Sequence, residues 1–224
     1  YLHFYTYLHF LSIILIVLYY IIMNVSDLKH GDLVLVNNKS TGIFNAFLNM
    51  IRWGTHSDYT HVAIIIDNPT FAEKSLKGTY VWQSTYEGIP DPQDDKIKLG
   101  VQLTGVDDFV DHYKNATCFV RRFSDVALFT DDNLKEAHDV AYDKPYDLYP
   151  KDWIEALVQK DSQPQKIDRF WCSAFVGFVL TKIGILHSDS DWSIMRPCDF
   201  ALDGENLKYA GDTKLEPVEY KLIH

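Results

Sequence analysis

The sequence predicts an α+β domain with a mostly antiparallel sheet. Most segments typical of strands come early, after residue 30, and the longest helical segments follow from about residue 130. Strands first and helices later favours α+β over an α/β fold, in which the two would alternate. A chain of 224 residues has room for one domain of ordinary size, and its 47% hydrophobic content can supply a core. We expect that domain over residues 31–224.

Short apolar runs bounded by turn residues predict the strands. They cover residues 33–36, 61–66, 79–85, 97–103 and 116–123. Helical spacing or capping signals predict helices over 43–53, 106–113, 130–142 and 172–183, and a short helix within 149–168. Thr130 is a candidate N-cap. The segment 172–183 is apolar on nearly every face, which predicts a buried helix ending at Gly184. The acidic run 91–95 is interpreted as a solvated loop.

Residues 1–23 form a hydrophobic segment without Asp, Glu, Lys or Arg. As a helix they would span about 34 Å, enough to cross a hydrocarbon core of about 30 Å. Tyrosines lie near both ends, as is typical of membrane interfaces. A cleaved signal peptide is one alternative, although no small-x-small site follows and no basic region precedes; a buried helix of the domain is another. We favour a single-pass membrane anchor over residues 1–23 and a hinge over residues 24–30.

The composition excludes several classes of protein. Lysine and arginine total 21 against 31 aspartate and glutamate, a formal net charge of −10, which argues against nucleic-acid binding. Three cysteines are too few for a disulfide scaffold. His56, Asp58 and His61 do not have the spacing of a standard zinc site, so we expect no metal and no cofactor.

Cys172 is the first candidate for chemistry, because it lies where a loop is expected to become a helix. In the first helical turn, unpaired backbone N–H groups and the helix dipole favour the nucleophilic thiolate. The same N–H groups can stabilise an oxyanion. The alternative is a small buried structural cysteine, which is also how we interpret Cys118 and Cys198.

His61 opens the predicted strand 61–66, from where its ring can project into a cleft and accept the thiol proton. A histidine that caps a turn is the alternative. One strand later, Gln83 shares a face with Val81 and Thr85, and an adjacent antiparallel strand would place it beside His61. Its amide oxygen can accept the ring N–H and fix the tautomer. Glu87 has a charge but follows the strand, so we favour Gln83 as the third group.

These residues occur in an order that resembles a known family. The matching motifs are Gly31-Asp32 before a strand, His61-Val-Ala-Ile, Val81-Trp-Gln-Ser-Thr, Lys144-Pro-Tyr-Asp and Trp171-Cys-Ser. Together, over roughly residues 29–200, they resemble the circularly permuted NlpC-type papain-like cysteine hydrolases, in particular the YiiX-like branch with bacterial and poxviral members. In this branch the histidine strand precedes the cysteine helix.

The resemblance implies a circularly permuted papain-like fold, in which an antiparallel sheet or barrel packs on the helix that carries the cysteine. It implies Cys172 as nucleophile and His61 as base. Gln83 stands where the family has a glutamate, and papain-like sites can use a neutral amide to orient the histidine. Lys144 stands where a glycine is usual.

Three further residues are candidates for contact with substrate or oxyanion: Tyr146, Trp171 and Ser173. The Tyr146 hydroxyl could donate to an oxyanion, or the side chain could belong to the core; both interpretations stay open. Trp171 is expected to be a cleft wall or a core residue.

The expected activity is hydrolysis of an amide, ester or thioester through an acyl-enzyme on Cys172. A membrane anchor favours membrane lipids, or acylated proteins and peptides near the membrane, as substrates. Acyl transfer, as in related permuted families of the lecithin–retinol type, is one alternative. A second is a membrane-anchored structural or interaction protein that keeps the fold without turnover. A third, a peptidoglycan peptide hydrolase, would require export.

Overall fold

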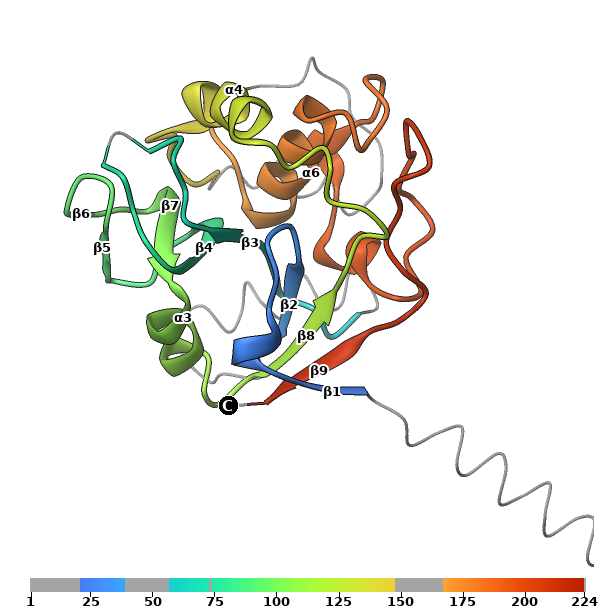
Figure 1. Ribbon diagram of the computed structural model, residues 1–224, viewed down its shortest axis with the longest axis horizontal. Helices are drawn as coiled ribbons and strands as arrows, with labels where there is room; N and C mark the ends of the chain where they lie inside the picture. The colour runs from blue at the N-terminus through green and yellow to red at the C-terminus, as the bar shows by residue number, and fades with distance from the viewer. Residues whose placement is uncertain (1–20, 39–56, 73, 148–166, 224) are drawn as a thin grey trace, which may run out of the picture.

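The computed structural model describes residues 21–38, 57–72, 74–147 and 167–223, which form a mixed α+β fold (Figure 1). A seven-stranded sheet has the order β1-β9-β8-β2-β3-β4-β7. Its strands are β1 (Ile21–Asn24), β2 (Leu33–Asn37), β3 (His61–Asp67), β4 (Thr79–Thr85), β7 (Gly100–Gly105), β8 (Thr117–Arg121) and β9 (Tyr220–Ile223). All neighbours run antiparallel except β1 and β9, which are parallel. The predicted class, α+β with a mostly antiparallel sheet, is confirmed.

Four of the five predicted strands are found with shifts of at most two residues at their ends: β2, β3, β4 and β8. The fifth, predicted over 97–103, is divided. Lys96–Ile97 forms β6, which pairs with β5 (Pro90–Asp91) in a separate hairpin, and the sheet strand β7 starts only at Gly100. Lys98 and Leu99, the latter at a bend, separate the two strands, and Gly100 begins β7 with a φ of 153°.

The helices are α3 (Val106–His112), α4 (Asp131–Ala141) and α6 (Cys172–Lys182), with 3-10 turns η1 (Val25–Asp27), η2 (Trp192–Ile194) and η3 (Pro197–Phe200). The Thr130 side chain accepts a hydrogen bond from the Asn133 amide at 3.3 Å, as predicted for an N-cap. Gly184 lies just beyond α6 with a φ of 82°. The helix predicted over 43–53 lies outside the described residues, and so does most of the segment 149–168.

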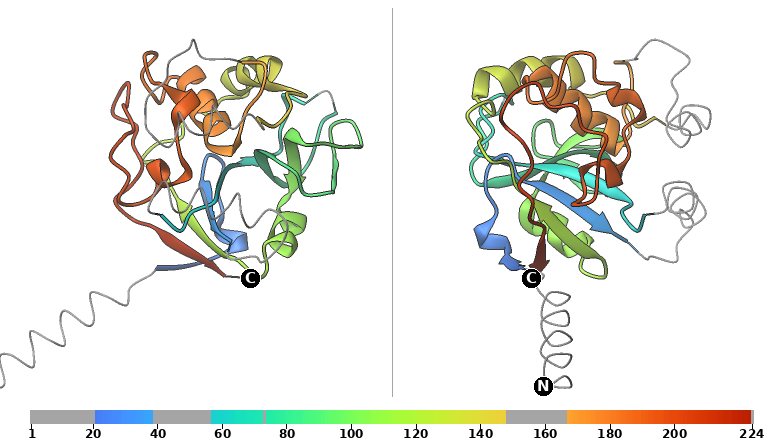
Figure 2. Two further views of the ribbon diagram at one scale, coloured as in Figure 1. Left: turned by 180° about the vertical axis from the view of Figure 1, so that it is seen from behind. Right: turned by 90° about the vertical axis from the view of Figure 1, so that its right-hand side faces the viewer.

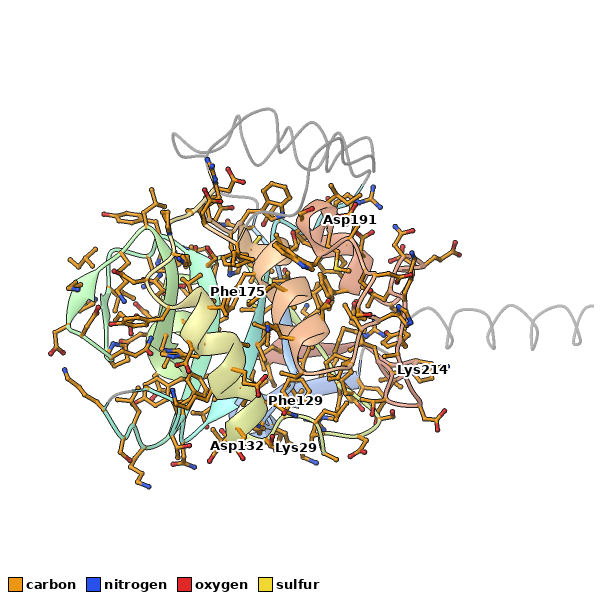
Figure 3. All side chains as sticks on the ribbon, turned by 90° about the horizontal axis from the view of Figure 1, so that it is seen from above. Lys29, Phe129, Asp132, Phe175, Asp191 and Lys214 are labelled. Atoms are coloured by element: carbon orange, nitrogen blue, oxygen red, sulfur yellow. The ribbon has the colours of Figure 1, made fainter. Side chains whose placement is uncertain are left out.

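The two faces of the sheet are covered by different helices. Figures 1 and 2 show α4 and α6 over one face and α3 against the other, and Figure 3 shows α4 and α6 side by side over the sheet. Val62 and Ile64 of β3 belong to the cluster under α6, whereas Ala63 belongs to the cluster under α3, as strand alternation requires. Phe175 of α6 packs edge-to-face on Trp82 of β4, with 5.0 Å between ring centroids.

The described domain starts earlier than residue 31. Ile21–Asn24, which spans the end of the predicted anchor and the start of the predicted hinge, is β1 and pairs with β9 at the sheet edge. Asp27 follows in η1, and its carbonyl accepts a hydrogen bond from Arg122 at 3.1 Å. An apolar run has the same hydropathy whether it forms a helix or a strand, so hydropathy did not predict this pairing. Residues 1–20 lie outside the described part. Within that part, no helix has the length and apolar character needed to cross a membrane.

The acidic run 91–95 is not a solvated loop throughout. Asp91 is completely buried, and its carboxylate lies 3.0 Å from Nζ of Lys98, which is itself buried. Asp94 pairs with the same lysine at 2.9 Å. A single lysine placed close in space therefore allows an aspartate to be buried, and the interpretation of Asp91 as solvated is wrong.

Gly100 is required by a close approach of two backbones. A Cβ at this position would overlap the carbonyl oxygen of Lys144, which accepts a hydrogen bond from the Val101 amide, and would lie 2.9 Å from Cα of Pro145. We expect Gly100→Ala to lower the free energy of unfolding by about 2 kcal/mol or more, because of this overlap and the positive φ. Denaturant unfolding measures the change. Gly211→Ala is the control, since no atom of the described residues lies within 4 Å of the added Cβ; equal effects of the two substitutions would contradict the packing argument.

Candidate active site

The candidate residues lie at the ends of elements that the sheet positions. His61 is the first residue of β3, opposite Val36 of β2. The register of β3 and β4 pairs Ile64 with Trp82, so His61 and Gln83 are close on neighbouring strands. His61 Nε2 and Gln83 Oε1 are 2.7 Å apart. The placement of Gln83 beside His61, inferred from strand alternation, is observed directly.

Gln83 connects the histidine to a second layer of polar side chains. Its Nε2 donates to Glu87 Oε1 at 2.9 Å and to Thr104 Oγ1 at 3.1 Å. The Thr104 hydroxyl in turn donates to Glu87 Oε2 at 2.7 Å. Glu87 thus reaches His61 through Gln83. The sequence presented Gln83 and Glu87 as competing partners of His61; in the structure they act in series.

Tyr113, which follows α3, contacts the face of the His61 imidazole. Its ring stacks on the His61 ring with centroids 5.9 Å apart and planes 20° from parallel. Its phenol interacts with the Thr85 side chain. Burial raises the pKa of this phenol, and the ionised forms of Glu87 and Cys172 would raise it further. Tyr113 could not be predicted from the sequence, because no local pattern connects a residue after a helix with a strand start 52 positions away.

Hydrogen bonds to the backbone of Phe170 hold the start of α6 against the sheet. The Ser84 hydroxyl of β4 donates to the Phe170 carbonyl at 2.6 Å. The Phe170 amide donates to the Pro145 carbonyl, and the Asp147 amide donates to the Phe170 carbonyl. These contacts place Tyr146, which lies between the two bonded residues, beside the chain that leads into Cys172.

Cys172 is the first residue of α6 and is 4% exposed. Backbone amides of Val62, Ser173 and Cys172 itself lower the pKa of the thiol, but burial raises it more, and the net shift is upward. The expectation that the helix start produces a thiolate is therefore wrong for the resting structure, because desolvation of the charged sulfur outweighs the amide dipoles. The interaction with the Val62 amide places the sulfur next to the His61–Val62 peptide.

His61 is neutral at rest. Burial lowers the pKa of its imidazole to about 4, although the hydrogen bond with Gln83 raises it and the nearby His112 lowers it slightly. The Cys172 thiol and the His61 imidazole are thus both neutral at pH 7. Within the described residues no hydrogen bond joins the Cys172 thiol to the His61 ring; in unliganded enzymes such bonds are often long and tighten when substrate binds.

Of the three substrate or oxyanion candidates, Tyr146 is the best placed. The Tyr146 hydroxyl interacts with the Cys172 thiol, and burial raises the pKa of this phenol well above its usual value, so it remains a hydrogen-bond donor. The side chains of Trp171 and Ser173 donate to the carbonyl of Met195, at 3.2 and 2.8 Å. The Ser173 hydroxyl also interacts with the Cys172 sulfur, which lowers the pKa of the thiol. The Ser173 backbone amide still faces the sulfur.

The remaining predictions concern metals and cysteines. Among the described residues, which do not include His56, no cluster of three His, Cys, Asp or Glu side chains could hold a metal ion. Cys118 is buried in β8 and Cys198 lies in η3; both are free thiols, as is Cys172.

Comparison of the chain with protein-family models and with curated proteins gives no match.

Two buried histidines predict a loss of stability in acid. Burial lowers the pKa of both His61 and His138 to about 4. As the pH falls from 7 to 5, the unfolded chain binds protons at these sites that the folded chain does not bind. Each histidine then removes about 2 kcal/mol from the free energy of unfolding.

Denaturant unfolding at several pH values measures this dependence. His61→Gln should reduce the loss between pH 7 and 5 by about 2 kcal/mol, leaving the part that belongs to His138. His138→Gln should reduce the same loss by a similar amount, leaving the part that belongs to His61. The interpretation would be wrong if His61→Gln and the wild type lost stability equally.

Proposed function

We propose that the protein is a cysteine hydrolase that forms an acyl-enzyme on Cys172. The proposal rests chiefly on one observation: the Cys172 sulfur, at the start of α6, faces the backbone amide of Val62, the residue next to His61. His61 in turn is hydrogen-bonded to Gln83. A nucleophile, a neighbouring base and a group that orients the base are the three parts that thiol catalysis requires.

The resting protonation states define the first step. Cys172 is a thiol and His61 a neutral imidazole whose Nε2 is occupied by Gln83. As the sulfur attacks the carbonyl carbon, His61 Nδ1 accepts the thiol proton, and the carbonyl π electrons move to oxygen. The backbone amides of Cys172 and Ser173 and the Tyr146 hydroxyl are the candidate donors to this oxyanion.

The second half of the reaction releases the acyl group. The tetrahedral intermediate collapses with breakage of the bond to the leaving group, which takes the proton from His61. Water then attacks the thioester carbonyl, His61 accepts one water proton, and Cys172 leaves as a thiol after receiving that proton. An alcohol or amine in place of water gives transfer instead of hydrolysis, so an acyltransferase follows from the same intermediate.

The order of motifs that resembles the permuted papain-like hydrolases supports the same function. In that fold a histidine strand comes first and the cysteine helix later, the order of β3 and α6 here. We extend the proposal to a single-pass membrane anchor before the domain, and to membrane lipids or membrane-proximal acylated proteins and peptides as substrates.

A protein that keeps this fold without turnover is the second candidate. The observation that favours it is the resting state of Cys172, a buried thiol with a raised pKa that makes no hydrogen bond with His61 among the described residues. Such a protein would form no acyl adduct on Cys172.

The two candidates differ in their reaction with activated esters. We expect p-nitrophenyl esters of short and long fatty acids to acylate the wild type at Cys172, as located by peptide mass spectrometry after acid quenching. Cys172→Ala should carry no adduct at this peptide and release no burst of p-nitrophenol. Cys198→Ala, which removes another free thiol, is the control and should react as the wild type. Acylation that persists in Cys172→Ala, or is absent from the wild type, would contradict the hydrolase.

Tyr146→Phe tests the candidate oxyanion donor. Removal of one such donor lowers the rate of acylation by about 100-fold in comparable sites, and we expect a loss of that order, because the phenyl ring keeps the packing but cannot donate. Stopped-flow release of p-nitrophenol measures it. Tyr142→Phe is the matched control: it removes a tyrosine hydroxyl that donates to Asp94 outside the site. A similar rate in both variants would remove Tyr146 from the mechanism.

A further inference from the structure

The buried polar side chains behind His61 form a closed set. Gln83, Glu87 and Thr104 are 0%, 9% and 2% exposed, and each is hydrogen-bonded to the other two. Glu87 is one side chain removed from the reacting groups, since it reaches His61 only through Gln83. Its carboxylate nevertheless determines how the other two side chains are arranged.

The amide of Gln83 has two orientations of nearly the same shape, which differ in whether oxygen or nitrogen faces His61. Burial raises the pKa of the Glu87 carboxyl, whereas the hydrogen bonds from Thr104 and Gln83 lower it by stabilising the carboxylate. In its ionised form the carboxylate can only accept hydrogen bonds. Glu87 Oε1 lies 2.9 Å from the amide, so the amide must turn its NH2 group towards Glu87. Its oxygen then faces His61 at 2.7 Å.

Thr104 makes this orientation the only satisfied one. Its hydroxyl has one proton, which it donates to Glu87 Oε2 at 2.7 Å, and it accepts the second N–H of Gln83 at 3.1 Å. If the Gln83 amide were turned over, its oxygen would face the oxygens of Glu87 and Thr104. Its buried NH2 group would lose both of its hydrogen-bond acceptors.

The orientation of the amide fixes the proton on the imidazole. Because Gln83 Oε1 only accepts, His61 Nε2 must carry the proton of the neutral ring. Nδ1 is then left with its lone pair, and it is the nitrogen that can accept a proton from a thiol.

We propose that Glu87 is a positioning residue that selects, through Gln83, the tautomer of His61 with its proton on Nε2. The inference rests on the proposed function in that the selected tautomer is the one with Nδ1 free to act as base. Glu87 thus supplies, one side chain further out, the acceptor that a glutamate next to the histidine would supply directly.

The tautomer can be measured without any reaction. In the whole 224-residue chain labelled with 15N-histidine, the nitrogen chemical shifts distinguish a protonated from an unprotonated ring nitrogen, and His61→Gln assigns the signals. We expect a single Nε2–H form for His61 in the wild type at pH 7. A His61 ring protonated at Nδ1 in the wild type would by itself overturn the proposal.

Glu87→Gln then tests the cause. The amide that this substitution introduces can donate as well as accept, so both orientations of the Gln83 amide can be paired, and we expect the Nδ1–H form to become populated. The acylation rate should fall at least tenfold, with little change in the ester concentration for half-maximal rate. A His61 ring that stays wholly in the Nε2–H form would overturn the role of Glu87. The signal of His138 reports whether the variant is folded; if it is not, Glu87→Met, which likewise removes the obligatory acceptor, takes its place.

Two further variants separate positioning from charge. Asp108→Asn removes an exposed negative charge that acts on Glu87 from α3, without touching the three hydrogen-bonded side chains; we expect the wild-type tautomer and rate. The exchange Gln83→Glu with Glu87→Gln puts an acceptor-only group directly on His61 and should restore the single Nε2–H form. Failure of the exchange to restore it would contradict the proposal.

The outcomes distinguish this inference from the proposed function. If the tautomer responds as described but no ester acylates Cys172, the hydrolase is wrong and the positioning by Glu87 stands. If Cys172 is acylated while Glu87→Gln leaves both tautomer and rate unchanged, the hydrolase stands and the positioning role of Glu87 is wrong.

Discussion

The site depends on one constraint, that polar groups buried within the sheet must find hydrogen-bond partners. Each buried donor or acceptor left without a partner costs about 1–3 kcal/mol. The hydrogen bond between His61 and Gln83 connects this constraint to the proposed chemistry, because it joins the proposed base to a buried polar network. Stacking by Tyr113 limits rotation of the same ring from its other side. The imidazole is therefore held by the interior of the domain and not by a surface loop.

Cys172, the proposed nucleophile, is positioned by the core in a comparable way. Helix α6 is buried along nearly its whole length, and packing of Phe175 on Trp82 fixes it over β4. Cys172, its first residue, therefore lies at the start of β3. The hydrogen bond from the Ser84 hydroxyl to the Phe170 carbonyl fixes the position of the chain just before the helix. This placement desolvates the Cys172 thiol and so raises its pKa. Under the proposed function, the thiol must then transfer its proton before or during attack.

Local periodicity predicted much of this arrangement. The alternation of side chains along β4 was sufficient to place Gln83 on the same face of the sheet as His61. The Thr130 N-cap and the buried helix α6 follow from sequence patterns within about ten residues. Long-range partners left no such pattern. The stacking of Tyr113, the pairing of β1 with β9 and the burial of Asp91 beside Lys98 depend on the assembled fold. The pKa of Cys172 was predicted with the wrong sign for the same reason, since a helix start is visible in sequence whereas the depth of burial is not.

The parallel pairing of β1 with β9 has a mechanical consequence. Tension applied at Ile21 along the strand would load its four pairs with Tyr220–Ile223 together, in shear, instead of opening them one after another like a zipper. Hydrogen bonds loaded together in shear resist rupture better than hydrogen bonds broken one at a time. The strands β1 and β9 therefore bear such a load as one unit. In the strand order, β9, β8 and β2 lie between β1 and β3. A force borne at this edge is thus distributed over three intervening strands before it reaches His61.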